Sequence, residues 1–314
     1  MDWLEITVQT TAENIESVAA MLTAGGFADL VIEDQQAFSS FLEENRAYWD
    51  YIDEKLQQQL QGLSRIKLYL EAGDESGFAR LQTLLERSGL AMEAKPMAEE
   101  NWEESWKENY PPQQIGSRLT VVPYWLADSV NDGRLPVILD PGLTFGTGAH
   151  PSTQMVMEAM EERVRPGTVC LDLGSGSGIL SIAALRLGAK KAIGMEIDPK
   201  AEEIARENAA YNGFSAPAFT ALTGNVTEDK ALMRRLAEGE YDVLLVNIVA
   251  DVIIGLSPIL PDFMGPRTVL ICSGILDSRL ADVTDALEAA GLTVTAIRAK
   301  EEWRCVTAKK GGSL

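Results

Sequence analysis

The first 96 residues repeat one pattern of apolar and polar positions. Period-two alternation indicates strands, and apolar residues three and four apart indicate the helices between them. The predicted order is strand 3–8, helix 15–22, strand 30–32, strand 66–70, helix 78–85 and strand 90–92. Two β-α-β halves predict a small ferredoxin-like α+β domain over residues 1–96. Residues 35–62, between the halves, add polar and aromatic sequence of no clear pattern.

Residues 97–118 are typical of a linker helix and its connection to a second domain. Trp102 and Trp106 are four residues apart and therefore share one helical face. The prolines at 111 and 112 stop the helix. We interpret the tryptophan pair as packing, which is the commoner role of such a pair.

Residues 119–314 alternate between strands and helices. The predicted strands are 169–173, 192–195, 243–246 and 269–272, the predicted helices are 179–187 and 200–211, and residues 292–297 and 306–308 predict a final antiparallel pair. This alternation is typical of a doubly wound, Rossmann-like α/β domain. In such a domain the ligand binds beyond the carboxyl ends of the strands.

A glycine-rich turn follows the predicted strand 169–173. Gly174, Gly176 and Gly178 alternate with serines, and such glycines permit a tight turn and close approach of a ligand to the backbone. A nicotinamide or flavin site requires a third glycine where Ile179 stands. Asp172 is also poorly placed for a pyrophosphate but tolerable beside a cation. S-adenosylmethionine has a sulfonium, an ammonium and no phosphate, so the pattern favours it.

Two further polar residues end predicted strands. Glu196 comes 22 residues after Gly174, and a carboxylate there can accept both ribose hydroxyls, whereas Asp198 before Pro199 is typical of a helix N-cap. Asn247 ends the strand next to the turn. Its carbonyl can accept a hydrogen bond from an amine and align it, or the residue can instead cap a helix at 248–256. The residues alone leave these two readings of Asn247 equal.

Residues 139–153 are rich in glycine and small polar residues and directly precede a predicted helix. A segment of this composition suits a flexible wall over a cofactor better than a plain linker. It contains His150, the only histidine of the chain, which we interpret as a structural turn residue. With a single histidine, the chain is a poor candidate for Ser-His-Asp catalysis or for a histidine-rich metal site.

Composition narrows the class of protein further. The three cysteines are far apart and predict neither a disulfide framework nor a metal site. No apolar run approaches the length of a membrane span, and the acidic N-terminus does not resemble a signal peptide, so we expect a cytoplasmic protein without membrane contact. Residues 1–110 hold 22 acidic and 8 basic residues. Such a region repels phosphate backbones and attracts a basic protein, although acidity also serves solubility.

Several segments together closely resemble the bacterial methyltransferases that modify ribosomal protein L11, the PrmA family. They are residues 139–153 (LDPGLTFGTGAHPST), 174–180 (GSGSGIL), 247–250 (NIVA), 273–276 (SGIL) and 301–303 (EEW). The resemblance extends over nearly the whole chain, including the first domain and the tryptophan pair. It implies a class I fold and transfer of methyl groups from S-adenosylmethionine to lysine side chains and the N-terminal amine of that basic ribosomal protein.

The resemblance also implies roles for single residues. By motif match the cofactor contacts are Thr153, Gly174, Glu196 and Asn247, to which the turn adds Gly176. The first domain would recognise the substrate and the linker would let it reposition. Glu196 stands where many relatives have aspartate, Asn247 is followed by Ile-Val-Ala-Asp rather than Ile-Leu-Ala-Gly, and residues 35–62 are longer than in the shortest members. Only the last departure bears on substrate choice.

We expect a direct displacement in which a neutral amine attacks the activated methyl, so that the protein mainly aligns and desolvates the reactants. One alternative is a class I methyltransferase of another protein, an RNA or a small molecule. The sequence after Asn247 lacks the Asn-Pro-Pro-Tyr type of motif found in many base and glutamine methyltransferases. The other alternative is a module that binds the cofactor without catalysis and acts in ribosome assembly.

Overall fold

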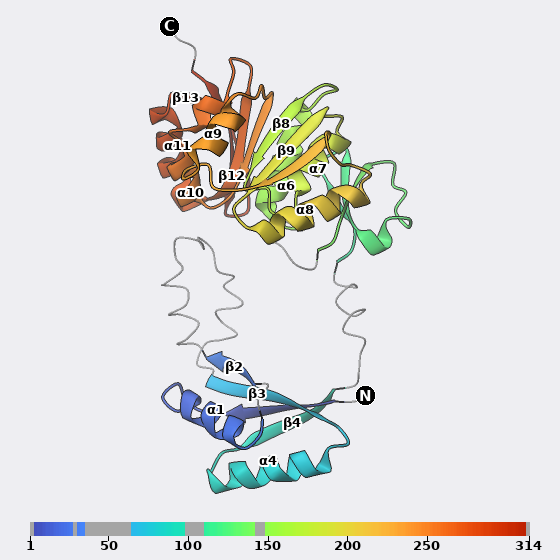
Figure 1. Cartoon of the computed structure of the whole chain (residues 1–314), viewed down its shortest axis with the longest axis vertical. Coiled ribbons are helices and arrows are strands. Elements are labelled where there is room, and N and C mark those ends of the chain that lie inside the picture. The colour runs from blue at the N-terminus through green and yellow to red at the C-terminus, as the bar shows by residue number, and fades with distance from the viewer. Residues whose placement is uncertain (1–2, 28–29, 35–63, 98–109, 142–147, 312–314) are drawn as a thin grey trace. The chain divides into compact units, whose positions relative to one another are not determined.

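The computed structural model describes residues 3–27, 30–34, 64–97, 110–141 and 148–311. It divides the chain into two compact units, Met1–Asn109 and Tyr110–Leu314 (Figure 1). Among the helices described, none has the length and apolar character needed to cross a membrane. Trp102, Trp106 and residues 35–62 and 142–147 lie outside the described residues.

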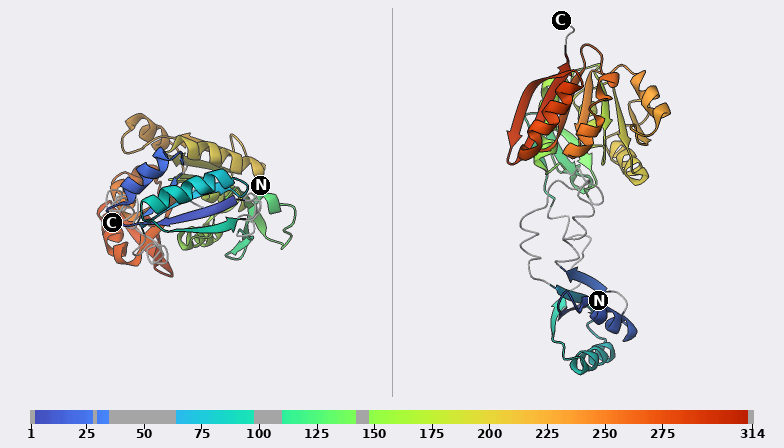
Figure 2. Two further views of the ribbon diagram at one scale, coloured as in Figure 1. Left: turned by 90° about the horizontal axis from the view of Figure 1, so that it is seen from below. Right: turned by 90° about the vertical axis from the view of Figure 1, so that its left-hand side faces the viewer.

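The described part of the first unit is an antiparallel four-stranded sheet with helices α1 and α4 on one face (Figure 2). Its elements are β1 (Trp3–Gln9), α1 (Ile15–Ala24), β2 (Leu30–Asp34), β3 (Ser64–Glu71), α4 (Glu75–Arg87) and β4 (Met92–Met97). The strand order β2-β3-β1-β4 interleaves two β-α-β halves, which confirms the predicted ferredoxin-like domain. The strand predicted at 90–92 begins later, because the Leu90 N–H closes the end of α4 on the Leu85 carbonyl at 3.0 Å.

The second unit contains a seven-stranded sheet in the order β10-β9-β8-β11-β12-β14-β13. The strands are β8 (Val169–Leu173), β9 (Lys191–Glu196), β10 (Phe219–Thr223), β11 (Val243–Asn247), β12 (Val269–Leu276), β13 (Leu292–Lys300) and β14 (Trp303–Lys310). Neighbours from β10 to β12 are parallel, whereas β14 is antiparallel to both β12 and β13. The doubly wound sheet and the final antiparallel pair are thereby confirmed. The chain order reverses between β8 and β11, which is where such sheets bind ligands.

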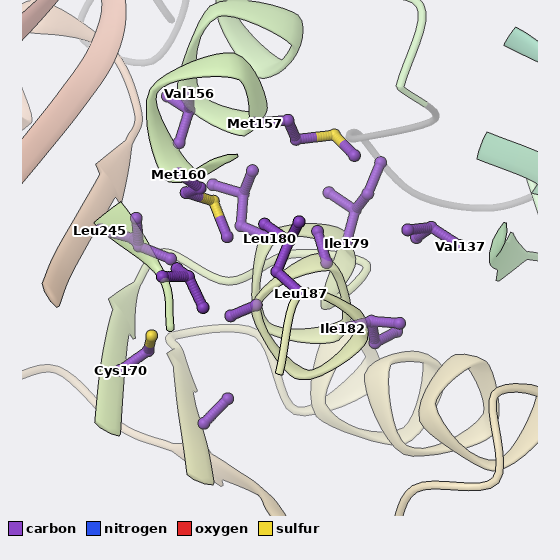
Figure 3. Close-up of a cluster of buried hydrophobic side chains, with 14 of the residues drawn as sticks. Val137, Val156, Met157, Met160, Cys170, Ile179, Leu180, Ile182, Leu187 and Leu245 are labelled. Carbon is purple, nitrogen blue, oxygen red and sulfur yellow. The ribbon is translucent and has the colours of Figure 1, made fainter. Parts of the chain in front are cut away.

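Helices cover both faces of this sheet (Figure 1). One face carries α6 (Pro151–Arg163), α7 (Ile179–Arg186) and α8 (Pro199–Tyr211), and the other carries α9 (Lys230–Ala237), α10 (Ala250–Leu256) and α11 (Leu280–Ala289). Figure 3 shows side chains of α6 and α7 meeting over Cys170 and Leu245 of the central strands. The described residues of the unit also form three short 3-10 helices: η1 (Tyr124–Leu126), η2 (Leu260–Phe263) and η3 (Asp277–Arg279).

A second, three-stranded sheet lies against α7 in the same unit. It is formed by β5 (Gln113–Ile115), β6 (Leu119–Pro123) and β7 (Leu135–Leu139), with β7 at its edge. Because this sheet covers its outer side, all but the last residue of α7 is buried, and its sequence is apolar all round. Residue patterns did not predict β5, β6, β7 or β10, which are strands of three to five residues.

Candidate cofactor site

The predicted cofactor residues meet at the carboxyl ends of three neighbouring strands. Leu173, the last residue of β8, pairs with Met195 of β9 on one side and with Val246 of β11 on the other. Glu196 and Asn247 are the next residues on these two strands. The glycine turn therefore leaves the sheet between the carboxylate and the carboxamide, at the point where the strand order reverses.

The turn itself depends on glycine at two positions. Gly174 has φ 77° and Gly178 has φ 81°, a region that L-residues with side chains rarely adopt. A Cβ on Gly174 would lie 2.5 Å from Cγ2 of Ile248, and one on Gly178 would lie 3.0 Å from Cβ of Ala205. The N–H of Gly174 also donates to the carbonyl of Met195 at 2.8 Å. The turn is thus packed between β9, β11 and α8.

Backbone donors fix the carboxylate of Glu196. Its Oε2 accepts from the N–H of Gly176 at 3.0 Å, and its Oε1 accepts from the N–H of Ile197 at 2.7 Å. A carboxylate has about four lone-pair sites, so both oxygens keep capacity for ribose hydroxyls. The predicted capping role of Asp198 is confirmed, since its side chain accepts from the N–H of Lys200 at 2.9 Å.

Asn247 is held by a residue far away in the sequence. Its Nδ2 donates to Oγ1 of Thr153, a fully buried residue in the first turn of α6, at 3.1 Å. The alternative role as a helix cap is wrong, because α10 begins at Ala250 after Val249, and no side chain caps it. Oδ1 of Asn247 is buried, and no donor among the described residues reaches it. A buried acceptor of this kind calls for a ligand donor.

Asp172 lies beneath the turn and is fully buried. Burial and the nearby charge of Glu196 raise the pKa of its carboxyl to about 7, against the effect of hydrogen bonds from Ser181. Its Oδ2 accepts from the N–H and the hydroxyl of Ser181 in the first turn of α7, at 3.2 and 2.8 Å. Its Oδ1 has no hydrogen-bond partner in the described part of the chain. Asp172 therefore ties the strand to the helix and leaves one oxygen unsatisfied.

His150 has a structural role, as interpreted from the sequence. It is the N-cap of α6, and its Nδ1 accepts from the N–H of Ser152 at 3.3 Å. Its ring packs edge-on against Trp303 with 4.5 Å between ring centroids. Burial lowers the pKa of the imidazole, with a smaller opposing effect of the nearby Glu301 and Glu302. The ring is therefore neutral near pH 7 and fixes the start of the helix that carries Thr153.

Sequence patterns missed two features beside Glu196. The side chain of Ile197, next to Glu196, is 61% exposed, which is an unusual placement for isoleucine. Gly224, after β10, donates its N–H to the carbonyl of Glu196 at 2.8 Å, which brings Asn225 to the same edge. Ile197 could have been found in the sequence from its position directly after Glu196, the acid that ends the strand. Asn225 follows a strand that was not predicted.

Metal ligands do not gather in this region. Within the described ranges, no group of three or more His, Cys, Asp or Glu residues is placed to hold a metal ion. Cys170, Cys272 and Cys305 are buried free thiols.

Comparison with known proteins identifies the family. The sequence matches the family described as ribosomal protein L11 methyltransferase (PrmA) over residues 2–311. The chain belongs to the PrmA family. Two relatives are both named ribosomal protein L11 methyltransferase. The one from Heliobacterium modesticaldum is 34% identical, over 99% of this chain and 98% of the relative. The one from Pelotomaculum thermopropionicum is 35% identical, over 98% of this chain and 99% of the relative. The crystal structure of a ribosomal protein L11 methylase from Lactobacillus delbrueckii subsp. bulgaricus is 28% identical, with a TM-score of 0.58, over 65% of this chain and 100% of that one.

Membership of the PrmA family confirms the predicted class I methyltransferase fold and S-adenosylmethionine as the cofactor. The residues present fit that cofactor. Glu196 offers fixed acceptors for a diol beside a glycine turn, and the unpartnered Oδ1 of Asn247 is free to accept from an amine at the same edge.

Proposed function

We propose that this chain transfers methyl groups from S-adenosylmethionine to lysine side chains and the N-terminal amine of ribosomal protein L11. The observation that carries the proposal is similarity over the full length to relatives named for this activity, with the first unit included. A site with a fixed carboxylate, a buried free acceptor and a glycine turn supports it independently.

In this proposal each site residue has a defined task. Glu196 accepts hydrogen bonds from the ribose hydroxyls, and the backbone at Gly174 and Gly176 lies against the cofactor. Oδ1 of Asn247 accepts a hydrogen bond from the attacking amine and aims its lone pair, and Thr153 holds the carboxamide in place. Bound S-adenosylmethionine supplies a methyl group on a sulfonium, which is already a good leaving group.

Proton removal needs no dedicated base. A lysine ammonium has a pKa of about 10.4, so the amine must lose a proton before attack. Nδ1 of His150 lies 2.6 Å from the hydroxyl oxygen and 3.3 Å from the backbone nitrogen of Ser152, so this ring nitrogen is already engaged at the start of α6. We infer that water takes the proton and that the protein selects the neutral amine by desolvation.

The division of labour between domains belongs to the same proposal. Residues 1–96 would recognise the substrate, residues 97–118 would connect, and residues 119–314 would catalyse. The 22 acidic and 8 basic residues before position 111 favour a basic protein over nucleic acid. We infer a cytoplasmic location, where new ribosomal proteins are available, and neither direct nucleic-acid binding nor membrane contact. Raising the ionic strength should increase the KM for the protein substrate.

The test is methyl transfer by the purified full-length chain to unmodified recombinant ribosomal protein L11. Intact-mass spectrometry should show added mass in whole methyl increments, and peptide mapping should place it on lysines and the N-terminal amine. The Asn247→Ala variant is the control for contaminating activity. If the chain leaves that protein unmodified but methylates another component of an extract, the proposed substrate is wrong. If it binds adenosylhomocysteine without transferring methyl groups to either, it is not an enzyme.

A further inference from the structure

Two asparagines, Asn208 in α8 and Asn212 at its C-cap, occupy an unusual position in the second unit. Asn208 and Asn212 are 0% and 6% exposed, and neither lies on the cofactor strands. They face β7, the edge strand of the three-stranded sheet, at the point where the chain enters the segment that follows Leu139. A buried carboxamide is costly unless all its groups are paired, so the partners of these side chains reveal their task.

Asn212 binds the edge of β7 as another strand would. Its Oδ1 accepts from the N–H of Ile138 at 2.9 Å, and its Nδ2 donates to the carbonyl of the same residue at 2.7 Å. Asn208 continues this ladder, because its Oδ1 accepts from the N–H of Asp140 at 2.9 Å. Residues four apart on a helix rise about 6 Å, and residues two apart on a strand about 6.6 Å. The two spacings match, so the asparagines substitute for a missing strand.

Asn208 has a second contact that Asn212 lacks. Its Nδ2 donates to the carbonyl of Ser177 in the glycine turn, at 2.9 Å. One carboxamide thus joins the turn to the backbone of Asp140. Three residues earlier on the same helix, Ala205 is the close neighbour of Gly178. The helix therefore meets the turn at two adjacent points, one apolar and one polar.

We propose that Asn208 is a positioning residue for the cofactor: it holds the glycine turn at Ser177 in place by tying it to the backbone of Asp140. Asn212 secures the edge of β7 and contributes mainly to stability. The proposal rests on the cofactor site described above and does not depend on which substrate is methylated. It assigns different consequences to two buried asparagines that are chemically identical and one helical turn apart.

The experiment compares Asn208→Ala with Asn212→Ala in the full-length chain. Isothermal titration with adenosylhomocysteine gives Kd, and thermal denaturation without ligand gives Tm. Both variants should lower Tm, because each leaves buried backbone groups unpaired. Asn208→Ala should also raise Kd about fivefold or more, whereas Asn212→Ala should change it less than about twofold, since one lost hydrogen bond to a ligand scaffold corresponds to roughly a two- to tenfold change. Kd increases that merely follow the loss of Tm in both variants, or an unchanged Kd in Asn208→Ala, would overturn the proposal.

A third variant keeps the test decisive if Asn208→Ala does not fold. Asn208→Asp retains the shape and the acceptor for Asp140, but at pH 8 it turns an anionic oxygen toward the carbonyl of Ser177. Its Kd relative to wild type should be raised at pH 8 and should recover toward pH 5.5, where a protonated carboxyl can donate as the amide does. A purely structural asparagine predicts no such pH dependence of the Kd ratio, so a flat ratio contradicts the proposal. Because ligand binding is the readout, failure here leaves the proposed substrate untouched.

Discussion

The two ends of the cofactor site are held by different kinds of contact. At the proposed ribose end, one oxygen of Glu196 accepts from the N–H of Gly176 in the turn, and the other accepts from the N–H of Ile197, which follows β9. At the proposed methyl-transfer end, Asn247 is held by one described side-chain hydrogen bond, from its amide to Thr153. The first arrangement is built into the course of the main chain, whereas the second depends on two side chains from distant elements.

This difference separates binding from alignment. Backbone donors keep their places in most variants, so the ribose end should tolerate changes elsewhere and govern affinity. A single side-chain contact leaves Oδ1 of Asn247 free for a ligand, and its position can be disturbed from either partner. The methyl-transfer end should therefore govern turnover.

The largest effect is expected from Asn247→Ala. Removing the acceptor leaves the amine unaligned, and misplacement by about 1 Å can cost about 100-fold in rate. We expect turnover of the protein substrate to fall about 100-fold, with Kd for adenosylhomocysteine within about threefold of wild type. Single-turnover kinetics and calorimetry measure the two. Thr153→Val keeps the carboxamide but removes its acceptor and should give an intermediate loss. Unchanged turnover in Asn247→Ala would remove its proposed role.

Glu196→Gln should have the opposite signature. The substitution removes the charge and places an amide beside the N–H of Gly176 or Ile197, so one backbone donor loses its partner. Hydrogen bonds to charged groups contribute about 1.5–3 kcal/mol, so Kd for the cofactor should rise at least about tenfold. Turnover at saturating cofactor should stay within about twofold, since the alignment of the amine is intact. Glu203→Gln on the exposed side of α8 is the matched control, and a fall in saturated turnover would contradict the separation.

Sequence patterns identified the ribose end more securely than the methyl-transfer end. Glycines, a strand-ending acid and the spacing between them are local features, and the prediction of Gly174 and Glu196 as cofactor contacts was based on them. The sequence left Asn247 between alignment and capping. Its described hydrogen-bond partner, Thr153, is 94 residues away, and the start of α10 at Ala250, which excludes capping, could not be seen in the sequence. Asn208 gave no signal at all, since an asparagine in an amphipathic helix looks solvent-exposed until its partner at Asp140, 68 residues distant, is known.

The fold was predicted in part. The strands of the first unit, in the order that makes it ferredoxin-like, and the central strands of the second unit were predicted, as were α1, α4, α7 and α8, whereas α9 and α11 were not. The edge sheet of β5 to β7 was missed. β5 has only three residues, too few for a period to show, whereas β6 and β7 have five, as do β8 and β11, so strand length alone does not explain their omission. The observed bounds of β4 and β12 differ from the predicted ones for another reason. Hydrogen bonds at the strand ends, rather than residue type, decide where pairing begins and stops.

Gly178→Ala should test how rigid the turn must be. The substitution places a side chain at φ 81° and 3.0 Å from Cβ of Ala205, so it adds a close contact to backbone strain. The expected loss in free energy of unfolding is about 1–3 kcal/mol, measured by urea denaturation. Gly213, which follows the end of α8, has a φ of 75° and open space around its Cβ position. Gly213→Ala should therefore cost only the backbone strain. Equal losses in the two variants would mean that contact with α8 is unimportant.

The smallest effect concerns the buried carboxyl under the turn. The pKa of Asp172 in the folded protein is about 7, against 3.8 for an unperturbed aspartate carboxyl. Between these values the folded protein holds a proton that the unfolded chain has released, so this group makes stability fall as pH rises from about 4 to about 7 and level off above. Asp172→Asn removes that slope, whereas the exposed Asp128→Asn should not. The Tm of the wild type minus the Tm of Asp172→Asn should therefore decrease by a few degrees between pH 5 and pH 8. If this difference in Tm does not change with pH, Asp172 is ionised throughout the range. A cation would then lie beside its Oδ1, for which the described residues offer no hydrogen-bond partner.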